Sequence, residues 1–137
     1  MTPTSYYHGT SLGFQLSKAR KSRYGFWALF FTDQVELAKN YAKFHSLSSL
    51  KNKGCLIEIE PPSISKVFDL KYESTYTADF RRLILAEKKL RTKVLLLKNT
   101  LDSPSLKRFA PMSSNILVVY DHSIIQNRII NNMPINC

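Results

Sequence analysis

The apolar residues of this chain gather in short runs of strand length, and this limits the folds that are open to it. The clearest runs are bounded by glycine, proline or polar residues and span positions 26–32, 55–59, 94–97 and 116–120. Runs this short, rich in Val, Ile, Leu and Phe, predict buried strands. None approaches the roughly 20 residues of a membrane-spanning helix, so we expect no transmembrane segment.

Helical spacing of apolar residues appears in three segments, at residues 12–20, 34–44 and 77–90. Asp33 and Glu36 form a capping-box pattern at the start of the second helix, and Thr77 can cap the third. Weaker strand signals and one long loop complete the pattern: strands at 5–8, 67–68 and 128–130, and the loop at 99–114. Since strands and helices do not alternate regularly, we expect an α+β fold.

The size and composition of the chain suit one globular domain. It has 137 residues, 44% of them hydrophobic, and we expect a single domain over 1–137. Cys55 and Cys137 make neither a disulfide framework nor a metal site, which favours a reducing compartment. The first residues lack the pattern of a conventional signal peptide. We therefore expect a cytoplasmic protein, or an effector or toxin delivered to a target cell by another route.

The formal net charge of +10 favours acidic partners. These include nucleic acid, an anionic membrane, an acidic protein surface and a phosphorylated cofactor. The alternative is a basic but merely solvated surface, because charge does not name its partner. The basic residues form three clusters: Lys18, Arg20, Lys21 and Arg23; Lys88, Lys89, Arg91 and Lys93; and Lys107 and Arg108.

His8 and Gly9 form the sharpest local signal for a binding site. They lie at the end of a predicted strand, where an imidazole edge and an open backbone can face a ligand. Glycine lets a flat ligand approach the main chain closely. Taken alone, a histidine at a strand end is more often an ordinary surface or core residue.

Tyr41 is the second candidate, on the predicted helix after the aromatic strand. Ala38 and Tyr41 lie beside each other on one face of that helix. A strand that leads into a helix with an inward tyrosine can form a slot for a planar aromatic ring. The alternative is that Tyr41 only packs in the core.

Together these features resemble the ADP-ribosyltransferase superfamily, in the branch related to diphtheria toxin and the poly(ADP-ribose) polymerases. Members have a strand ending in His-Gly-Thr, and later a strand followed by a helix ending in Ala/Ser-x-x-Tyr. This chain has His8-Gly9-Thr10, then Leu-Phe-Phe-Thr-Asp at 29–33 and Ala38 to Tyr41.

The second half of the chain adds to the resemblance. Residues 115–121, Asn-Ile-Leu-Val-Val-Tyr-Asp, are similar to the last catalytic strand of the polymerases. Residues 55–69 and 94–102 are similar to small members associated with phages and mobile elements. The likeness therefore runs through nearly the whole chain in the family's order.

The resemblance implies an ADP-ribosyltransferase-like fold, with split mixed or antiparallel sheets and a few flanking helices, that uses NAD and no metal. His8 would donate to the 2′-hydroxyl of the nicotinamide ribose, the Gly9 backbone would bind the amide, and Tyr41 would stack on the nicotinamide. Ala38 stands where relatives often have a serine that holds the amide. Further expected cofactor-binding residues lie toward the adenosine and pyrophosphate: Thr10, Ser11, Arg20 and Arg23.

Two expected catalytic positions depart from the family pattern. Phe30 stands where a tyrosine is usual, and Ile116 where a glutamate is usual; a shift by one residue would bring Asn115 there instead. Isoleucine can neither accept a hydrogen bond nor take a proton. The family has mono-ADP-ribosylating and inactive members with an apolar residue there, so polymer formation is not expected. A carboxylate of the target protein, or a phosphate, could replace the lost glutamate.

The expected function is NAD-dependent mono-ADP-ribosyl transfer, by a monomer, to an acidic protein or nucleic-acid acceptor with release of nicotinamide. One alternative is a weak or inactive module of the same fold that binds NAD or ADP-ribose. Another is a small basic nucleic-acid-binding toxin. Slow NAD hydrolysis also stays open.

Glu58 and Glu60 suggest a different branch of the superfamily, which modifies arginine through Glu-x-Glu. That branch needs an arginine on the first strand and a Ser-Thr-Ser strand, and this chain has neither. We expect the two glutamates to form the solvated face of a strand. His45 and His122 have no partner at metal spacing, so we expect both on the surface.

Overall fold

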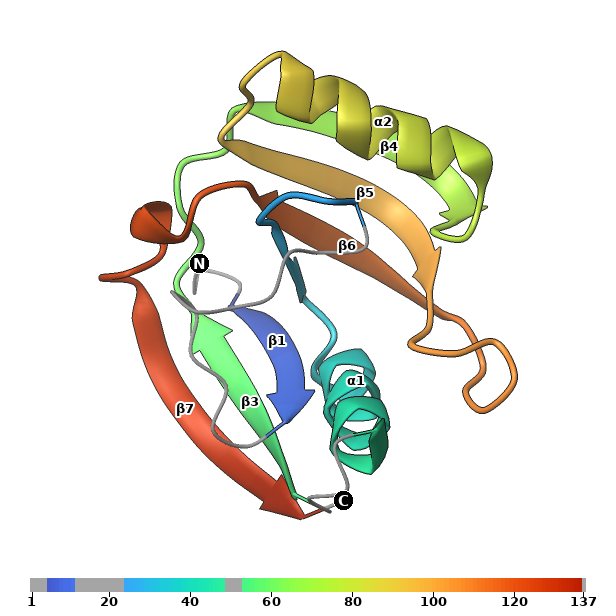
Figure 1. The fold of residues 1–137 in the computed structure, drawn as a ribbon, viewed down its shortest axis with the longest axis vertical. Coiled ribbons are helices and arrows are strands. Elements are labelled where there is room, and N and C mark those ends of the chain that lie inside the picture. The colour runs from blue at the N-terminus through green and yellow to red at the C-terminus, as the bar shows by residue number, and fades with distance from the viewer. Residues whose placement is uncertain (1–4, 12–23, 49–52, 137) are drawn as a thin grey trace.

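The computed structural model describes residues 5–11, 24–48 and 53–136, which form an α+β fold (Figure 1). One mixed sheet carries the strands in the order β4-β5-β6-β2-β1-β3-β7. The strands are β1 (Tyr6–Ser11), β2 (Leu29–Thr32), β3 (Lys53–Ile59), β4 (Lys66–Ser74), β5 (Val94–Asp102), β6 (Met112–Val119) and β7 (Ile129–Asn136). The helices are α1 (Val35–Ser48) and α2 (Ala78–Lys89). The α+β class expected from the sequence is confirmed, but the strands form one mixed sheet and not the split sheets that the resemblance implies.

The sheet has a narrow seam between β1 and β2. These strands pair antiparallel at one position, Tyr7 with Thr32, whereas β1 pairs with β3 along its whole length. Figure 1 shows the two parts on either side of the seam, with α2 beside β4 and β5 and with α1 beside β1. Because α1 follows directly after β2, its side chains lie at this seam.

Alternating side chains of the central strands build a core on each face of the sheet. On one face Leu96 of β5 and Leu117 of β6 pack with Phe31 and Ile57. On the other face the next residues along β5 and β6, including Leu97, pack against α2. This is the period-two pattern of a sheet buried on both sides, and it explains why these strands are continuous apolar runs in the sequence.

Helix α2 begins at the residue that the sequence predicts. The Thr77 hydroxyl accepts a hydrogen bond from the Phe80 backbone N–H at 3.1 Å, which satisfies one of the unpaired donors of the first turn. Phe80 and Ile84 are buried against the sheet, as expected. Leu90, expected inward, is 65% exposed because the helix has ended before it.

Strand β4 shows where the sequence pattern is weakest. The expected extended piece at 67–68 is a nine-residue strand that pairs parallel with β5, and α2 forms the crossover between them. The chain thus contains one βαβ unit that the sequence does not reveal. Most of β4 is exposed at the edge of the sheet, so it lacks the apolar run of a buried strand.

Two further expectations are wrong in detail. The long loop expected at 99–114 is shorter, because β5 continues to Asp102 and β6 begins at Met112. Asp33 does not act as the expected cap of α1; its carboxylate accepts hydrogen bonds from the backbone N–H and the side-chain amide of Asn115. The Thr32 hydroxyl instead accepts from the Gln34 N–H. The helix expected at 12–20 lies outside the described residues.

Neither helix of the described chain is long and apolar enough to cross a membrane.

Candidate functional site

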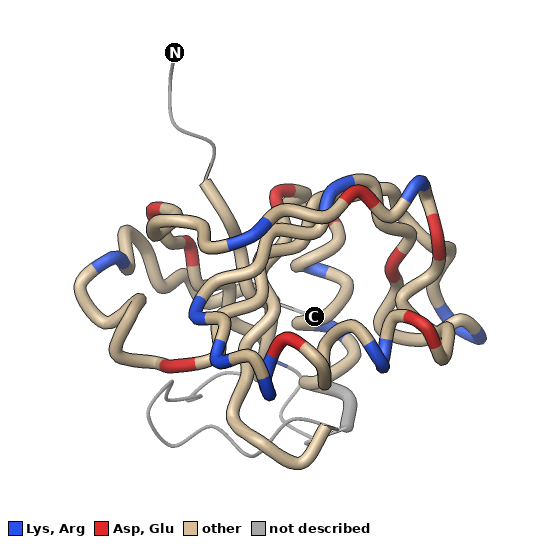
Figure 2. Tube along the Cα trace, turned by 90° about the horizontal axis from the view of Figure 1, so that it is seen from above, with Lys and Arg blue, Asp and Glu red and all other residues tan. Residues whose placement is uncertain are grey.

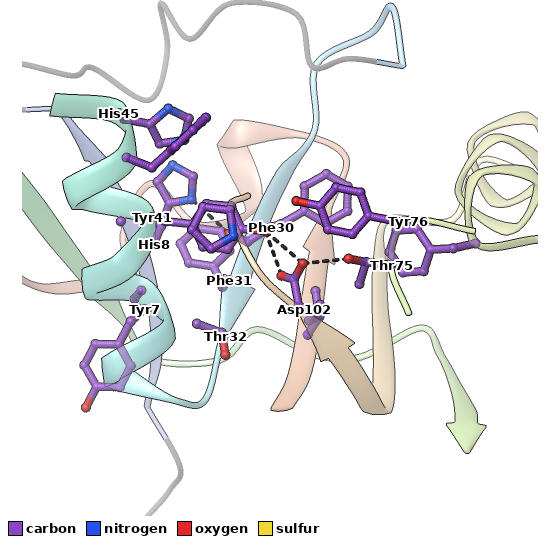
Figure 3. A pocket seen from close by; sticks show the side chains of 16 residues that line it. Tyr7, His8, Phe30, Phe31, Thr32, Tyr41, His45, Thr75, Tyr76 and Asp102 are labelled. Carbon is purple, nitrogen blue, oxygen red and sulfur yellow. Dashed lines mark hydrogen bonds between the residues drawn. The ribbon is translucent and has the colours of Figure 1, made fainter. Parts of the chain in front are cut away.

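A cavity of about 380 Å³ opens at the seam of the sheet (Figure 3). Its walls come from β1, β2, α1, the start of α2, the end of β5 and β6. Most lining side chains are apolar or aromatic, which suits a site for a flat organic ligand. The lining residues are Tyr7, His8, Gly9, Phe30, Phe31, Thr32, Ala38, Tyr41, Phe44, His45, Thr75, Tyr76, Phe80, Asp102, Pro104 and Ile116.

His8 is held by the strand beside it. Its Nδ1 donates a hydrogen bond of 2.9 Å to the backbone carbonyl of Phe30 on β2, and its ring lies 5.5 Å from that of Phe31. Burial lowers the pKa of His8 to about 4, so the imidazole is neutral near pH 7. A neutral imidazole that donates through Nδ1 carries a lone pair on Nε2, which makes Nε2 an acceptor.

The lowered pKa of His8 predicts acid sensitivity. The unfolded chain binds a proton near pH 6.5, whereas the folded chain does so only near pH 4. The contribution of neutral His8 to the free energy of unfolding is therefore fully present above pH 6.5. It falls by roughly 3 kcal/mol as the pH drops to 4. His8→Asn keeps a donor for the Phe30 carbonyl and should lose this part of the pH dependence. Urea unfolding at pH 7, 5 and 4 tests this; equal acid sensitivity in variant and wild type would contradict it.

The close packing of α1 on β1 requires a glycine at position 9, whether or not a ligand binds there. A Cβ at this position would lie 1.7 Å from the backbone carbonyl oxygen of Ala38 and 2.8 Å from the backbone nitrogen of Ala42. Helix α1 therefore passes directly over β1, and only glycine permits that approach. The same contact brings Ala38 and the rest of this helix turn to the cavity wall.

Tyr41 reaches across the cavity from α1 to the end of β5. Its hydroxyl lies 2.8 and 2.9 Å from the two carboxylate oxygens of Asp102. Asp102 also accepts a 2.6 Å hydrogen bond from the Thr75 hydroxyl and one from the Ser103 backbone N–H. Figure 3 shows Tyr41, Asp102 and Thr75 joined in this network. The network ties both parts of the sheet together across the seam.

His45 belongs to the site, although the sequence places it only on the surface. One turn after Tyr41 on α1, its ring stacks on the tyrosine with 6.2 Å between centroids and 27° between planes. Burial lowers its pKa, and it interacts electrostatically with His8. Two imidazoles and a phenol therefore share one wall of the cavity (Figure 3).

The structure brings most of the expected site residues together. His8, Gly9, Phe30, Ala38, Tyr41 and Ile116 all line the cavity. Asn115 does not line it, because its side chain donates to Asp33 and accepts from the Asn99 N–H. Thr10 and Ser11 pair with β3 and also do not line it. Arg20 and Arg23 lie outside the described residues.

Asp102, Thr75 and Tyr76 are further polar residues of the site that were not expected from the sequence. The Tyr76 hydroxyl donates to the backbone carbonyl of Ser103, next to Asp102. These residues lie before α2 and at the end of β5, and only the βαβ crossover brings them to the seam. The signal that was available is Asp102 itself, an acidic residue five positions after the apolar run at 94–97.

Neither the Glu58 and Glu60 alternative nor a metal site is supported by the arrangement of side chains in the described residues. Glu58 accepts a hydrogen bond of 2.8 Å from the Asn131 side chain on β7, and it does not line the cavity. No set of three or more His, Cys, Asp or Glu side chains in the described segments is placed to hold a metal ion. No family model, no curated protein and no solved structure matches the chain.

Proposed function

We propose that this protein binds NAD in the cavity at the seam and transfers its ADP-ribose to an acceptor, with an ADP-ribosyltransferase-like fold. The observation that carries the proposal is that His8, Gly9 and Tyr41, distant in sequence, line the same cavity. This is the grouping that the resemblance to the family implies. The cavity is large enough for the nicotinamide and its ribose, and it is largely apolar as a pocket for a planar ring should be.

The nicotinamide ring stacks on Tyr41 in this proposal. The phenol is fixed at its hydroxyl by Asp102 and on one ring face by His45, so a ligand meets a preorganised surface. Offset stacking of aromatic rings contributes about 0.5–1.5 kcal/mol beyond the area that it buries. Ala38 offers no hydroxyl, so the amide has one partner fewer than in relatives with a serine.

His8 has the opposite hydrogen-bonding role to the one that the resemblance implies. Its Nδ1 donates to the Phe30 carbonyl and its low pKa keeps it neutral. Nε2 is therefore a hydrogen-bond acceptor, and the 2′-hydroxyl of the nicotinamide ribose is the donor. This arrangement orients the sugar without placing a positive charge beside it.

The reaction breaks the bond between nicotinamide and ribose through a cation-like sugar. Orientation and the placement of charge around that sugar lower its barrier. Neutral histidines suit such a site, because a cationic residue there would oppose the developing charge. Ile116 and Phe30 close the wall with apolar surface, which favours a single transfer rather than the growth of a polymer.

Incubation with NAD labelled in the nicotinamide ring tests the proposal. We expect NAD binding by calorimetry and release of free nicotinamide that increases when an acceptor is added as cell extract. Binding without release would support the alternative of a non-catalytic NAD-binding module. Absence of NAD binding would contradict the proposal in both forms.

A second candidate function rests on a basic hollow at the carboxyl end of α2. This hollow has a volume of about 390 Å³. Lys88, which lines it, follows Phe80 of the seam cavity by about 12 Å along the axis of α2. Figure 2 shows Lys and Arg on many parts of the trace, but here four of them surround one hollow. The hollow is lined by Lys88, Lys89, Arg91, Lys93, Thr92, Tyr120 and Asp121. Such a cluster favours the phosphates of a nucleic acid.

Neutralising the hollow should weaken nucleic-acid binding. Changing Lys88, Lys89, Arg91 and Lys93 to glutamine removes four positive charges, and the salt dependence of binding to a single-stranded oligonucleotide should fall by a slope of about 3. Fluorescence anisotropy from low to moderate salt measures it. The control changes Lys43, Lys53, Arg82 and Lys98, which are exposed elsewhere. An equal loss in both variants would contradict a specific surface.

A further inference from the structure

Asp102 is the one acidic side chain among the described residues that line the seam cavity. It is 8% exposed and stands at the last position of β5. The sequence pattern of the family places no functional residue there. A buried carboxylate at the wall of an apolar cavity needs a reason, since burying such a group is costly unless it is well hydrogen-bonded.

The carboxylate is held in a fixed position by groups from three parts of the chain. The Tyr41 hydroxyl on α1, the Thr75 hydroxyl before α2 and the Ser103 backbone N–H all donate to it. Donors of this kind stabilise the ionised form and fix its orientation. The carboxylate is therefore held in a fixed position in the cavity wall, shown beside Tyr41 and Thr75 in Figure 3.

We propose that Asp102 is the catalytic carboxylate of this site and acts from β5, whereas Ile116 on β6 contributes only apolar surface. The inference rests on the proposed reaction with NAD. Breaking a glycosidic bond creates positive charge on the sugar, and a fixed carboxylate close to that charge stabilises the transition state. Asp102 is the residue of the cavity wall that carries such a group.

The proposed reaction needs no reactant besides NAD and the acceptor. The bond between ribose C1′ and the pyridinium nitrogen breaks, and its electron pair leaves with the ring as neutral nicotinamide. The positive charge passes to the sugar, where the Asp102 carboxylate stabilises it. The acceptor, a hydroxyl, an amine or water, then gives an electron pair to C1′ and forms the new bond. Its proton goes to Asp102 and from there to solvent.

Other carboxylates of the described chain are unsuited to this role. Asp33 lies near the seam and accepts hydrogen bonds from Asn115, but it does not line the cavity. Glu87 is buried, but it contacts Lys66 and Thr92 at the far end of α2. Asp102 is therefore distinguished by where it lies, not by burial alone.

A purely structural role for Asp102 makes a different prediction. If the carboxylate only anchored Tyr41, its loss would weaken NAD binding and stability, and a small anion would not restore turnover. Replacing Asp102 with alanine leaves a space beside the reacting sugar that formate can enter. Formamide has the same size without the charge, so the pair isolates the carboxylate.

The experiment measures nicotinamide release by the whole chain as wild type, Asp102→Asn and Asp102→Ala, with NAD binding and thermal unfolding recorded for each. Asp79→Asn, an exposed acidic residue of α2, is the control for the loss of one charge. We expect both Asp102 variants to release nicotinamide about 10²–10³-fold more slowly. Formate should restore at least tenfold in Asp102→Ala, formamide should not, and Asp79→Asn should match the wild type.

The remaining outcomes separate the two proposals. Wild-type turnover that persists in both variants, or that formamide restores as well as formate, overturns the role of Asp102 while the proposed function stands. NAD binding by a wild type that releases no nicotinamide also overturns it. If the wild type does not bind NAD, the proposed function fails and the inference fails with it. If Asp102→Ala does not fold, release by the closer mimic Asp102→Asn decides.

Discussion

Replacing Gly9 with alanine is expected to destabilise the protein by about 3 kcal/mol or more. The added methyl group would lie 1.7 Å from the Ala38 carbonyl oxygen and 2.8 Å from the Ala42 nitrogen, and both are backbone atoms of α1. No side chain can rotate away to make room, so the helix must move off β1. Because α1 carries Tyr41, NAD binding should be lost with the same change.

Gly25→Ala is the matched control. Gly25 has a φ of +88°, which strains an alanine, but nothing lies within 4 Å of the position where its Cβ would be. We expect a cost of about 1 kcal/mol there, from backbone strain alone. Urea unfolding followed by far-UV circular dichroism measures both variants. A Gly9→Ala protein as stable as Gly25→Ala would show that α1 does not pack on β1 as described.

Tyr41→Ala should weaken NAD binding by about 10- to 100-fold, the effect of losing one stacking ring. The change also removes the donor that reaches both oxygens of Asp102. Tyr41→Phe separates the two contributions, because it keeps the ring and deletes only the hydroxyl. We expect Tyr41→Phe to bind NAD within a few-fold of the wild type.

The two Tyr41 variants should differ less in stability than in binding. Loss of a hydrogen bond to a charged group costs about 1.5–3 kcal/mol, and both variants lose it. Isothermal titration calorimetry with NAD, together with urea unfolding, provides both quantities. Equal NAD affinity in Tyr41→Ala and the wild type would remove the stacking role, whatever the stabilities show.

The sequence predicts the parts of the fold whose side chains are patterned by burial. The apolar runs around Leu97 and Leu117 and the cap at Thr77 all correspond to observed elements. Strand β4 is predicted only at 67–68, because it is an exposed edge where no apolar pattern is needed. The missed ends of β5 and β6 have the same origin, since polar residues such as Asn99 and Ser113 lie there and resemble a loop.

The candidate site likewise has residues that the sequence predicts and residues that only the tertiary structure reveals. His8, Gly9 and Tyr41 belong to local motifs, and their grouping around one cavity agrees with the resemblance. Asp102 and Thr75 meet Tyr41 only through long-range pairing of β4, β5 and α2, which no local motif encodes. The direction of the His8 hydrogen bond is likewise a tertiary property, because the Phe30 carbonyl sets it.

The most direct test of the account is a crystal structure of the protein with a non-cleavable carbocyclic analogue of NAD. We predict the nicotinamide stacked on Tyr41, with the 2′-hydroxyl of its ribose within hydrogen-bonding distance of His8 Nε2. A nicotinamide bound away from Tyr41 and His8, or a seam cavity that stays empty at saturating analogue, would contradict it.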